Sequence, residues 1–306
     1  MNILATSPSF SKNTLLQNEI YKHFPNAKLN LEGKRFNKSE LIEYIKEADA
    51  VVVGLEPIDQ EVLDQCPNLK IVSKYGVGLN NIDIEACQKR EIAIGWSGGV
   101  NKLSVAEMTL GYMLMLCRNL FITTTQLKQG TWNKSGGFQL SGKTVGIIGV
   151  GHIGKEVVRL LEPFGCKILV NDIIDQTQYY QEHNLIAVSK EEIYQQADII
   201  TIHTPFDSTT DNLIDLKVFK QMKTTAFILN SARGGIINEN DLKYALKNEL
   251  ISGAAIDAYV EEPPTDRELI ELPNLICTPH IGGNAKEAVE AMGLSAIKHL
   301  VEYFDK

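Results

Sequence analysis

Three glycines near the middle of the chain constrain its fold more than any other feature. Gly149, Gly151 and Gly154 follow a short apolar run, residues 144–148, and begin a segment of helix-forming composition, residues 152–162. In a βαβ unit, the first glycine of this spacing makes the tight turn, the second lets a phosphate approach the backbone, and the third brings helix and strand together. The N–H groups at the start of the helix then bind the phosphate. The spacing therefore predicts a dinucleotide-binding site.

An aspartate after the next apolar run indicates which dinucleotide binds. Asp172 lies 18 residues after Gly154, where the run of residues 167–171 ends. A carboxylate at this place accepts hydrogen bonds from the adenosine ribose hydroxyls and repels a 2′-phosphate. No arginine or lysine follows directly, so the sequence favours NAD over NADP. Asp175 is an alternative ribose ligand, although we expect it to lie in the turn beyond the strand.

Apolar runs of strand length alternate with helical segments along the whole chain, in two series. This alternation is typical of βαβ units around a parallel sheet, so we predict an α/β fold with two doubly wound parallel-sheet domains. The first series covers residues 2–6, 50–54, 69–73 and 92–95, and the second covers residues 144–148, 167–171, 185–188, 198–203, 226–230, 253–257 and 275–278.

The length of 306 residues is about twice that of a typical domain, which agrees with two series of strands. An almost entirely apolar stretch, residues 105–120, predicts a buried connecting helix, and residues 131–137 predict an exposed loop. The tail, residues 285–304, has helical spacing, and we expect it to pack on the first domain. We therefore predict a Rossmann NAD-binding domain of residues 101–284, inserted in a flavodoxin-like substrate domain of residues 1–100 and 285–306.

Charge and composition argue against several other classes of protein. A net charge of −8 disfavours binding to nucleic acid or to an anionic membrane, because both would be repelled. No apolar run approaches the length of a membrane-spanning helix, and the first residues do not resemble a signal peptide, so we expect a cytoplasmic protein. The five cysteines are scattered and predict neither a disulfide framework nor a zinc site. His152 and His203 lack the spacing of metal ligands, so we expect no metal.

Four polar side chains follow the ends of strands in the second series. Arg233 comes after residues 226–230, Asp257 ends the next run, Glu262 follows it, and His280 comes after the last run. The carboxyl ends of parallel strands meet at one edge of a sheet, where ligands bind. Arginine can bind a carboxylate at two points, and histidine can take the proton of a hydroxyl group near neutral pH. Glu262 would then fix the tautomer of the ring, and Asp257 would orient the nicotinamide amide.

The order and spacing of these motifs resemble those of the D-isomer-specific 2-hydroxyacid dehydrogenases, most closely the D-3-phosphoglycerate dehydrogenase-like members. The resemblance covers most of the chain and implies catalytic roles for Arg233, Glu262 and His280. It also implies a homodimer formed through the nucleotide-binding domains, with the loop of residues 131–137 reaching towards the partner. The motifs that carry it are residues 74–83, 101–107, 149–154, 203–205, 230–235, 257–263 and 278–283.

The resemblance implies further contacts with cofactor and substrate. The implied cofactor contacts are Gly149, Gly151, His152, Ile153, Gly154, Asp172, His203, Thr204, Pro205, Ser231, Ala232, Arg233, Asp257, His280 and Gly282. The implied substrate contacts are Lys74, Asn101, Arg233, His280 and the residues Gly76, Val77 and Gly78, whose backbone N–H groups would bind the substrate carboxylate. Lys74 is otherwise a solvated strand end, and the sequence leaves these two interpretations open.

One departure from the family bears on the substrate. The segment of residues 54–57 lacks the arginine that phosphoglycerate enzymes often place there to bind a phosphate, although Lys74 could partly substitute. We expect a D-2-hydroxy acid, with 3-phosphoglycerate first and glycerate, hydroxypyruvate or glyoxylate as alternatives. A different class of function is a corepressor-like protein that senses NAD and binds peptides with the same fold. The presence of Arg233, Glu262 and His280 together favours the enzyme.

Overall fold

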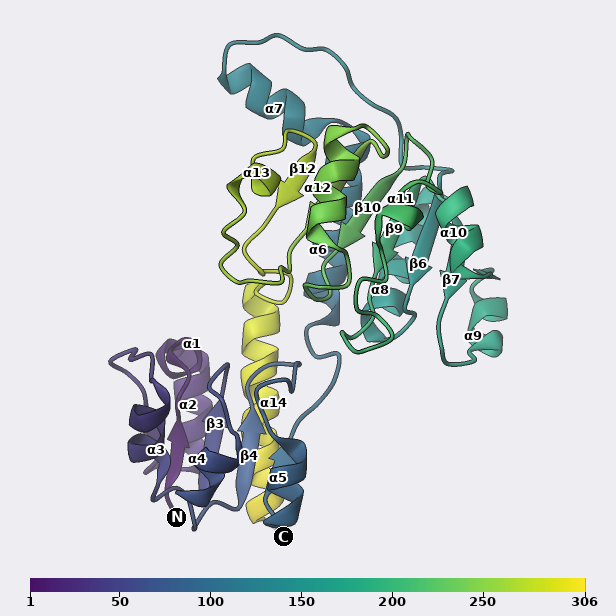
Figure 1. Ribbon diagram of the computed structural model, residues 1–306. Helices are drawn as coiled ribbons and strands as arrows, with labels where there is room; N and C mark the ends of the chain where they lie inside the picture. Colours follow the sequence, from purple (N-terminus) through teal and green to yellow (C-terminus); the bar gives the residue numbers. More distant parts are fainter. Residues whose placement is uncertain (306) are drawn as a thin grey trace. The chain divides into compact units, whose positions relative to one another are not determined.

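The computed structural model describes residues 1–305, which form two compact units (Figure 1). Unit 1 contains residues 1–101 and 284–305, and unit 2 contains residues 102–283. The domain boundaries predicted from the sequence differ from these limits by one residue at each crossing of the chain. The observed sheets confirm the predicted fold class of two parallel-sheet α/β domains.

Five parallel strands form the sheet of unit 1 in the order β2-β1-β3-β4-β5, within the described residues. This is the flavodoxin-like order that the sequence predicts. The strands are β1 (Ile3–Ala5), β2 (Lys28–Leu29), β3 (Ala50–Val53), β4 (Ile71–Lys74) and β5 (Ala93–Gly95), and the helices are α1 (Pro8–Lys12), α2 (Thr14–His23), α3 (Lys38–Ile45), α4 (Gln60–Asp64), α5 (Ile84–Lys89) and α14 (Lys286–Phe304).

Helices cover both faces of this sheet, which explains why its central strand is apolar throughout. All four residues of β3 are buried, because alternate side chains point to opposite faces. Val51 and Val53 pack with α3, α4 and α5, whereas Ala50 and Val52 pack with α1, α2 and α14. The tail helix α14 contacts α2 and β4, and the Ser73 hydroxyl donates a hydrogen bond of 2.8 Å to the Ala296 carbonyl.

Seven parallel strands form the sheet of unit 2 in the order β12-β11-β10-β9-β6-β7-β8, among the residues that the structure describes. The chain starts at the centre with β6, adds β7 and β8 on one side, and then crosses to β9 on the other. This reversal is the Rossmann arrangement, in which ligands bind at the carboxyl ends of the two strands where the order reverses, here β6 and β9. The strands are β6 (Thr144–Ile148), β7 (Lys167–Asn171), β8 (Ile186–Ala187), β9 (Ile199–Ile202), β10 (Phe227–Asn230), β11 (Gly253–Ile256) and β12 (Leu275–Cys277).

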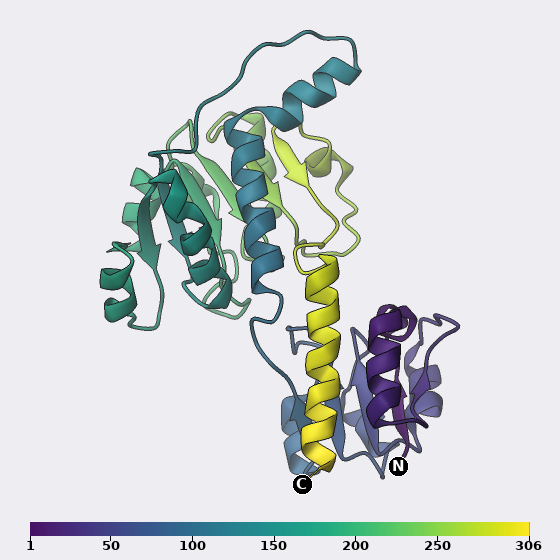
Figure 2. The same cartoon turned by 180° about the vertical axis from the view of Figure 1, so that it is seen from behind.

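Helices also cover both faces of the second sheet. One face packs against α6 and α8, as Figure 2 shows from behind, and the other packs against α10, α11, α12 and α13. The helices of unit 2 are α6 (Lys102–Cys117), α7 (Leu120–Lys128), α8 (His152–Leu161), α9 (Thr177–Glu182), α10 (Lys190–Gln196), α11 (Leu216–Phe219), α12 (Glu239–Lys247) and α13 (Arg267–Ile270). In the described chain no single helix is long and apolar enough to cross a membrane, although α6 and α7, bent by 65° at their break, meet that test when combined.

Two elements differ from the sequence prediction. The strand β2 was not expected, because it has only two residues and lies at an edge of the sheet without an apolar run. The helix predicted over residues 105–120 starts earlier, at Lys102, and ends at Cys117. Asn119 has a φ of 52°, a left-handed conformation that interrupts the helix, and α7 begins directly after it. The segment of residues 129–139 then extends away from the sheet of unit 2 as an exposed loop (Figure 1).

Candidate active site

The three glycines lie between β6 and α8 and have three different surroundings. Gly149 has a φ of 93°, and a Cβ atom on it would lie 2.6 Å from the His203 carbonyl oxygen. A Cβ atom on Gly154 would lie 2.2 Å from the Gly149 carbonyl oxygen, so helix and turn approach closely there. Around a Cβ atom on Gly151, by contrast, no atom of the described residues lies within 4 Å apart from Gly151 itself and its two chain neighbours. The middle glycine therefore faces open space at the start of α8, which fits a phosphate group.

Asp172 holds the glycine loop against the end of β7. Its Oδ2 atom accepts a hydrogen bond of 2.6 Å from the Val150 N–H group, and its Oδ1 atom accepts one of 2.9 Å from the Ile174 N–H group. Asp175 instead accepts hydrogen bonds from the hydroxyl and the N–H group of Thr177, which lower the pKa of its carboxyl group. Both carboxylates accept backbone hydrogen bonds, so Asp172 differs from Asp175 only in its contact with the glycine loop, and its role as the ribose ligand stays a prediction.

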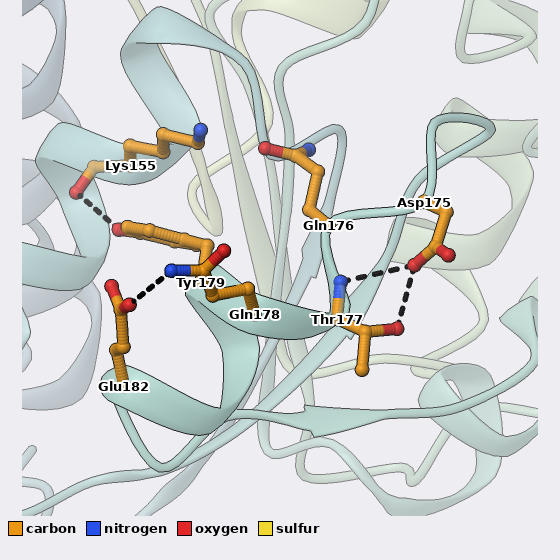
Figure 3. Close-up of a pocket in the computed structure, with 7 residues that line it drawn as sticks. All are labelled: Lys155, Asp175, Gln176, Thr177, Gln178, Tyr179 and Glu182. Carbon is orange, nitrogen blue, oxygen red and sulfur yellow. Dashed lines mark hydrogen bonds between the residues drawn. The ribbon is translucent and has the colours of Figure 1, made fainter.

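A shallow hollow lies beside this region, between α8 and α9 (Figure 3). The Lys155 ammonium group lies 4.5 Å from the centre of the Tyr179 ring. The Gln176 amide donates a hydrogen bond of 3.1 Å to the Val150 carbonyl, which connects the hollow to the glycine loop. The residues around the hollow are Lys155, Asp175, Gln176, Thr177, Gln178, Tyr179 and Glu182, and none of the predicted catalytic residues is among them.

Two buried polar atoms beside the glycine loop fit a bound dinucleotide. The Nδ1 atom of His203 and the Oγ1 atom of Thr204 are buried and have no hydrogen-bonding partner within residues 1–305. Burial lowers the pKa of the His203 ring to about 3, so the ring is neutral, and its Nε2 atom lies 2.9 Å from the Thr201 hydroxyl. Buried polar groups nearly always have a partner, and cofactor groups at the neighbouring Gly149 turn would supply one.

Arg233 lies in a tight turn after β10. The Asn230 side chain closes this turn, because its Oδ1 atom accepts from the Ala232 N–H group and its Nδ2 atom donates to the Arg233 carbonyl at 2.7 Å. A Cβ atom on Gly234 would lie 2.0 Å from the Tyr259 carbonyl carbon and oxygen. Only glycine permits this approach, which brings the Arg233 turn against the loop after β11. The cofactor candidate Ser231 is buried, 3.1 Å from the Thr109 hydroxyl.

His280 and Glu262 come together as the sequence predicts. The Nδ1 atom of His280 lies 2.8 Å from Oε1 and 2.9 Å from Oε2 of Glu262. Oε1 also accepts a hydrogen bond of 3.1 Å from the Tyr259 N–H group, which fixes the carboxylate. His280 has a φ of 52°, an uncommon conformation for a residue with a side chain, and such conformations cluster at functional sites. A carboxylate that accepts a hydrogen bond from the Nδ1–H group fixes the tautomer and the orientation of the ring.

Asp257 directly follows β11, at the strand end that the sequence predicts. It is buried, with 1% of its surface exposed, and both carboxylate oxygens accept hydrogen bonds from the turn that carries His280. Oδ1 accepts from the Thr278 hydroxyl at 2.5 Å and from the Ile281 N–H group at 2.9 Å, and Oδ2 accepts from the Gly282 N–H group at 2.8 Å. The Tyr112 hydroxyl of α6 also hydrogen-bonds to the Thr278 hydroxyl. Asp257 thus holds the histidine turn, and a contact with the nicotinamide amide stays a prediction.

Replacing Asp257 with alanine is expected to lower the free energy of unfolding by about 2–4 kcal/mol, because one buried and two partly buried donors lose their acceptor. Tyr112→Phe removes a single hydroxyl from the same network and should lower it by about 1 kcal/mol. Urea unfolding followed by circular dichroism measures both values. Equal stability of Asp257→Ala and the unchanged protein would contradict this role for Asp257.

In unit 1, the candidate substrate residues lie at the carboxyl edge of the sheet. Lys74 is 5% exposed, and its ammonium group donates to the Gly54 carbonyl at 2.5 Å and to Asn81 Oδ1 at 2.6 Å. It is therefore no solvated strand end. Gly76 has a φ of 140°, and a Cβ atom on it would lie 3.1 Å from the Lys74 Cε atom. Asn101 is buried, and in the described chain its Oδ1 atom has no hydrogen-bonding partner.

Several residues of the site carry no signal in the sequence. Tyr112 lies in the apolar stretch of α6, and its contact with Thr278 joins residues 166 positions apart. Trp96 donates a hydrogen bond of 2.9 Å from its indole nitrogen to the Val77 carbonyl. Only the folded topology brings such distant residues together.

Comparison with known proteins supports the same family that the sequence motifs predict. The model of the D-isomer specific 2-hydroxyacid dehydrogenase family, NAD-binding domain, matches residues 110–282. The chain is 38% identical over 260 residues to the D-3-phosphoglycerate dehydrogenase of Methanocaldococcus jannaschii, which covers 84% of this chain and 50% of that enzyme. It is 34% identical over 283 residues to the hydroxypyruvate reductase of Thermotoga maritima, with coverage of 89% and 90%.

The fold is also similar to that of known structures. A crystal structure of a protein from Thermus thermophilus superimposes with a TM-score of 0.90 at 27% identity, covering 100% of this chain and 97% of that one. The chain spans about half the length of the phosphoglycerate dehydrogenase that it matches. Together these similarities confirm the predicted family and the predicted NAD-binding domain. The chain belongs to the D-isomer specific 2-hydroxyacid dehydrogenase family.

Proposed function

We propose that this chain is an NAD-dependent dehydrogenase that interconverts a D-2-hydroxy acid and its 2-keto acid, with unit 1 as the substrate domain. The observation that carries the proposal is the pair of His280 and Glu262, joined at 2.8 Å on a turn that Asp257 holds in place. An acid or base whose ring is oriented by a carboxylate is what carbonyl reduction requires. The family membership and the glycine loop support NAD as the cofactor.

Each catalytic residue has a distinct task in this proposal. Bound NADH would supply the hydride that reduces the keto carbon. Glu262 accepts a hydrogen bond from the Nδ1–H group of His280 and stabilises the protonated ring, whose Nε2–H group donates its proton to the keto oxygen as that oxygen becomes a hydroxyl group. Arg233 binds the substrate carboxylate with its planar guanidinium group, and the N–H groups of residues 76–78 are the predicted substrate contacts of unit 1. In the reverse direction, His280 takes the proton of the hydroxyl group.

The proposal predicts that the protein oxidises NADH when a suitable 2-keto acid is present. A panel of glyoxylate, hydroxypyruvate, 3-phosphohydroxypyruvate and 2-ketobutyrate, followed by NADH absorbance, tests this directly. NADPH should be a poor substitute, because Asp172 would repel its 2′-phosphate. An unchanged NADH absorbance with every acid, from protein that binds NADH, would contradict the proposed reaction and favour the corepressor-like alternative.

The proposed substrate class includes 3-phosphoglycerate as well as the unphosphorylated acids glycerate, hydroxypyruvate and glyoxylate. Relatives of similar identity have names from both groups, so overall similarity does not separate them. The difference between them is the charge at the end of the substrate away from the carboxylate.

We further propose that the protein forms a homodimer through unit 2. The helix α7 has no buried residue within its described length, and Leu120, Leu127 and Trp132 are 48%, 55% and 77% exposed. Large apolar side chains gathered on one extended segment are typical of an interface. Sedimentation velocity should give twice the monomer mass, and the pair Leu120→Glu and Leu127→Glu should shift it towards monomer. A monomeric unchanged protein at micromolar concentration would contradict the dimer.

A further inference from the structure

Four of the five loops at the carboxyl edge of unit 1, those after β1, β3, β4 and β5, have charges that are unusual for a site that binds a phosphorylated acid. These four loops cover residues 6–9, 54–59, 75–83 and 96–101, and their sequences contain no arginine, lysine or histidine. The fifth loop, residues 30–37 after the edge strand β2, contains Lys34, which pairs with Glu40 at 3.1 Å, and Arg35. Two lysines adjoin these loops in the sequence, Lys74 at the end of β4 and Lys102 at the start of α6. Lys102 pairs with Glu156 at 3.3 Å. Phosphate groups are usually bound by cations or by several N–H groups together.

The position of Lys74 explains what its charge does. The ammonium group is buried under the loop of residues 76–78, and it donates to the Gly54 carbonyl and to Asn81 Oδ1. The Asn81 amide in turn donates to the Glu56 carbonyl at 2.7 Å. These contacts connect the ends of β3 and β4 below the loop. Lys74 therefore supports the loop that would bind the substrate carboxylate.

An acidic side chain lies at the end of β3. The Glu56 Oε2 atom accepts a hydrogen bond of 2.8 Å from the Gly54 N–H group. This contact fixes a carboxylate at the place where a phosphate-binding loop would need an N–H group or a cation. A phosphate dianion near Glu56 would be repelled, because like charges at a protein surface repel strongly at short range.

Trp96 supports the same loop from the end of β5. Its indole N–H group donates to the Val77 carbonyl at 2.9 Å, and 41% of the residue is exposed. Leu55, after β3, is 91% exposed. A substrate carboxylate bound by the N–H groups of residues 76–78 would place the rest of the substrate near this indole. The side chains at this edge therefore offer an aromatic face and an apolar side chain.

We propose that Trp96 is a specificity-determining residue, and that the substrate is a 2-keto acid whose group beyond the keto carbon is uncharged and carries no phosphate. The indole hydrogen bond to the Val77 carbonyl positions the carboxylate-binding loop, and the indole face lies beside the distal group of the substrate. Glu56 excludes a phosphate from the same edge. This inference rests on the proposed dehydrogenase function.

The direct test compares two substrates that differ only in the phosphate group. For the unchanged protein, we expect kcat/KM for hydroxypyruvate to be about 100-fold higher than kcat/KM for 3-phosphohydroxypyruvate. A preference for the phosphorylated acid, or equal use of both, would overturn the inference while leaving the dehydrogenase function intact. No turnover of any keto acid would instead refute the proposed function.

Two matched variants separate the two parts that Trp96 plays. Trp96→Phe keeps an aromatic face but lacks the N–H donor, so KM should rise about tenfold for both acids while their ratio of kcat/KM stays the same. Trp96→Gln keeps an amide donor but lacks the aromatic face, so the ratio should fall about tenfold. Glu56→Gln, which keeps an oxygen for the Gly54 N–H group, should improve use of the phosphorylated acid by about tenfold. An unchanged ratio in Trp96→Gln would overturn the role of Trp96.

Fluorescence provides a readout of binding that does not depend on turnover. The chain has two tryptophans, so Trp132→Phe leaves Trp96 as the sole reporter. With NAD⁺ already bound, added hydroxypyruvate cannot react, because both are oxidised. Its binding should change the Trp96 emission at concentrations about tenfold lower than 3-phosphohydroxypyruvate requires. No change in emission at saturating hydroxypyruvate would contradict a position of Trp96 beside the substrate.

Discussion

Replacing His280 with alanine is expected to lower kcat for the best 2-keto acid by about 10²–10⁴-fold, while the affinity for NADH stays within about twofold. The Nε2 proton of His280 reaches the keto oxygen in the proposed reaction, and alanine has no proton to offer. The His280 side chain is 44% exposed, so its removal leaves no cavity in the core. Steady-state kinetics and a fluorescence titration with NADH measure the two quantities.

Glu262→Gln is the matched control for this prediction. Glutamine keeps the size of the side chain but has no negative charge to stabilise a protonated ring, so kcat should fall less than in His280→Ala. If His280→Ala instead abolished NADH binding, the residue would serve the cofactor rather than the proton transfer. If it left kcat unchanged, another residue would be the acid.

Replacing Gly151 with valine is expected to weaken NADH binding by about 100-fold or more without lowering the stability of the protein. Apart from Gly151 itself and its two chain neighbours, no atom of the described residues lies within 4 Å of a Cβ atom there, so the added side chain occupies only the space in which a phosphate would lie. Gly154→Val should instead lower the stability of the protein, and its main effect should not be on NADH binding. Its Cβ atom would lie 2.2 Å from the Gly149 carbonyl oxygen, and we expect a loss of about 1–3 kcal/mol in unfolding free energy.

Urea unfolding and NADH titration of the same two variants distinguish these outcomes. Tight NADH binding by Gly151→Val would show that the cofactor does not pass this glycine. A fully stable Gly154→Val would show that the close contact between α8 and the turn is not needed for the fold.

The sequence predicts the parts of this fold that depend on local patterns. The apolar runs at 50–54 and 144–148 are sufficient to predict two central strands, because a strand buried on both faces must be apolar throughout. The glycine spacing at 149–154 is sufficient to predict the turn and helix that follow the second of them. The strand β2 has too few residues to form such a pattern. The end of α6 is set by the left-handed Asn119, which a continuous apolar stretch does not reveal.

In the candidate site too, the sequence predicts what depends on local patterns and misses what depends on contacts between distant residues. The pair of His280 and Glu262 is predictable, because both residues follow strands of one parallel sheet. The function of Asp257 is not, because its three hydrogen bonds come from a turn more than 20 positions away in the chain. Burial of Lys74 is also hidden from the sequence, since a lysine at a strand end is usually exposed.

The path of the hydride tests the central proposal most directly. The protein is incubated with hydroxypyruvate and NADH that carries deuterium at the transferred position, and the product is analysed by mass spectrometry and chiral chromatography. The proposed reaction predicts D-glycerate with one deuterium at carbon 2, and no such product from His280→Ala in the same time. An L-product, or a reduced product without deuterium at carbon 2, would contradict it.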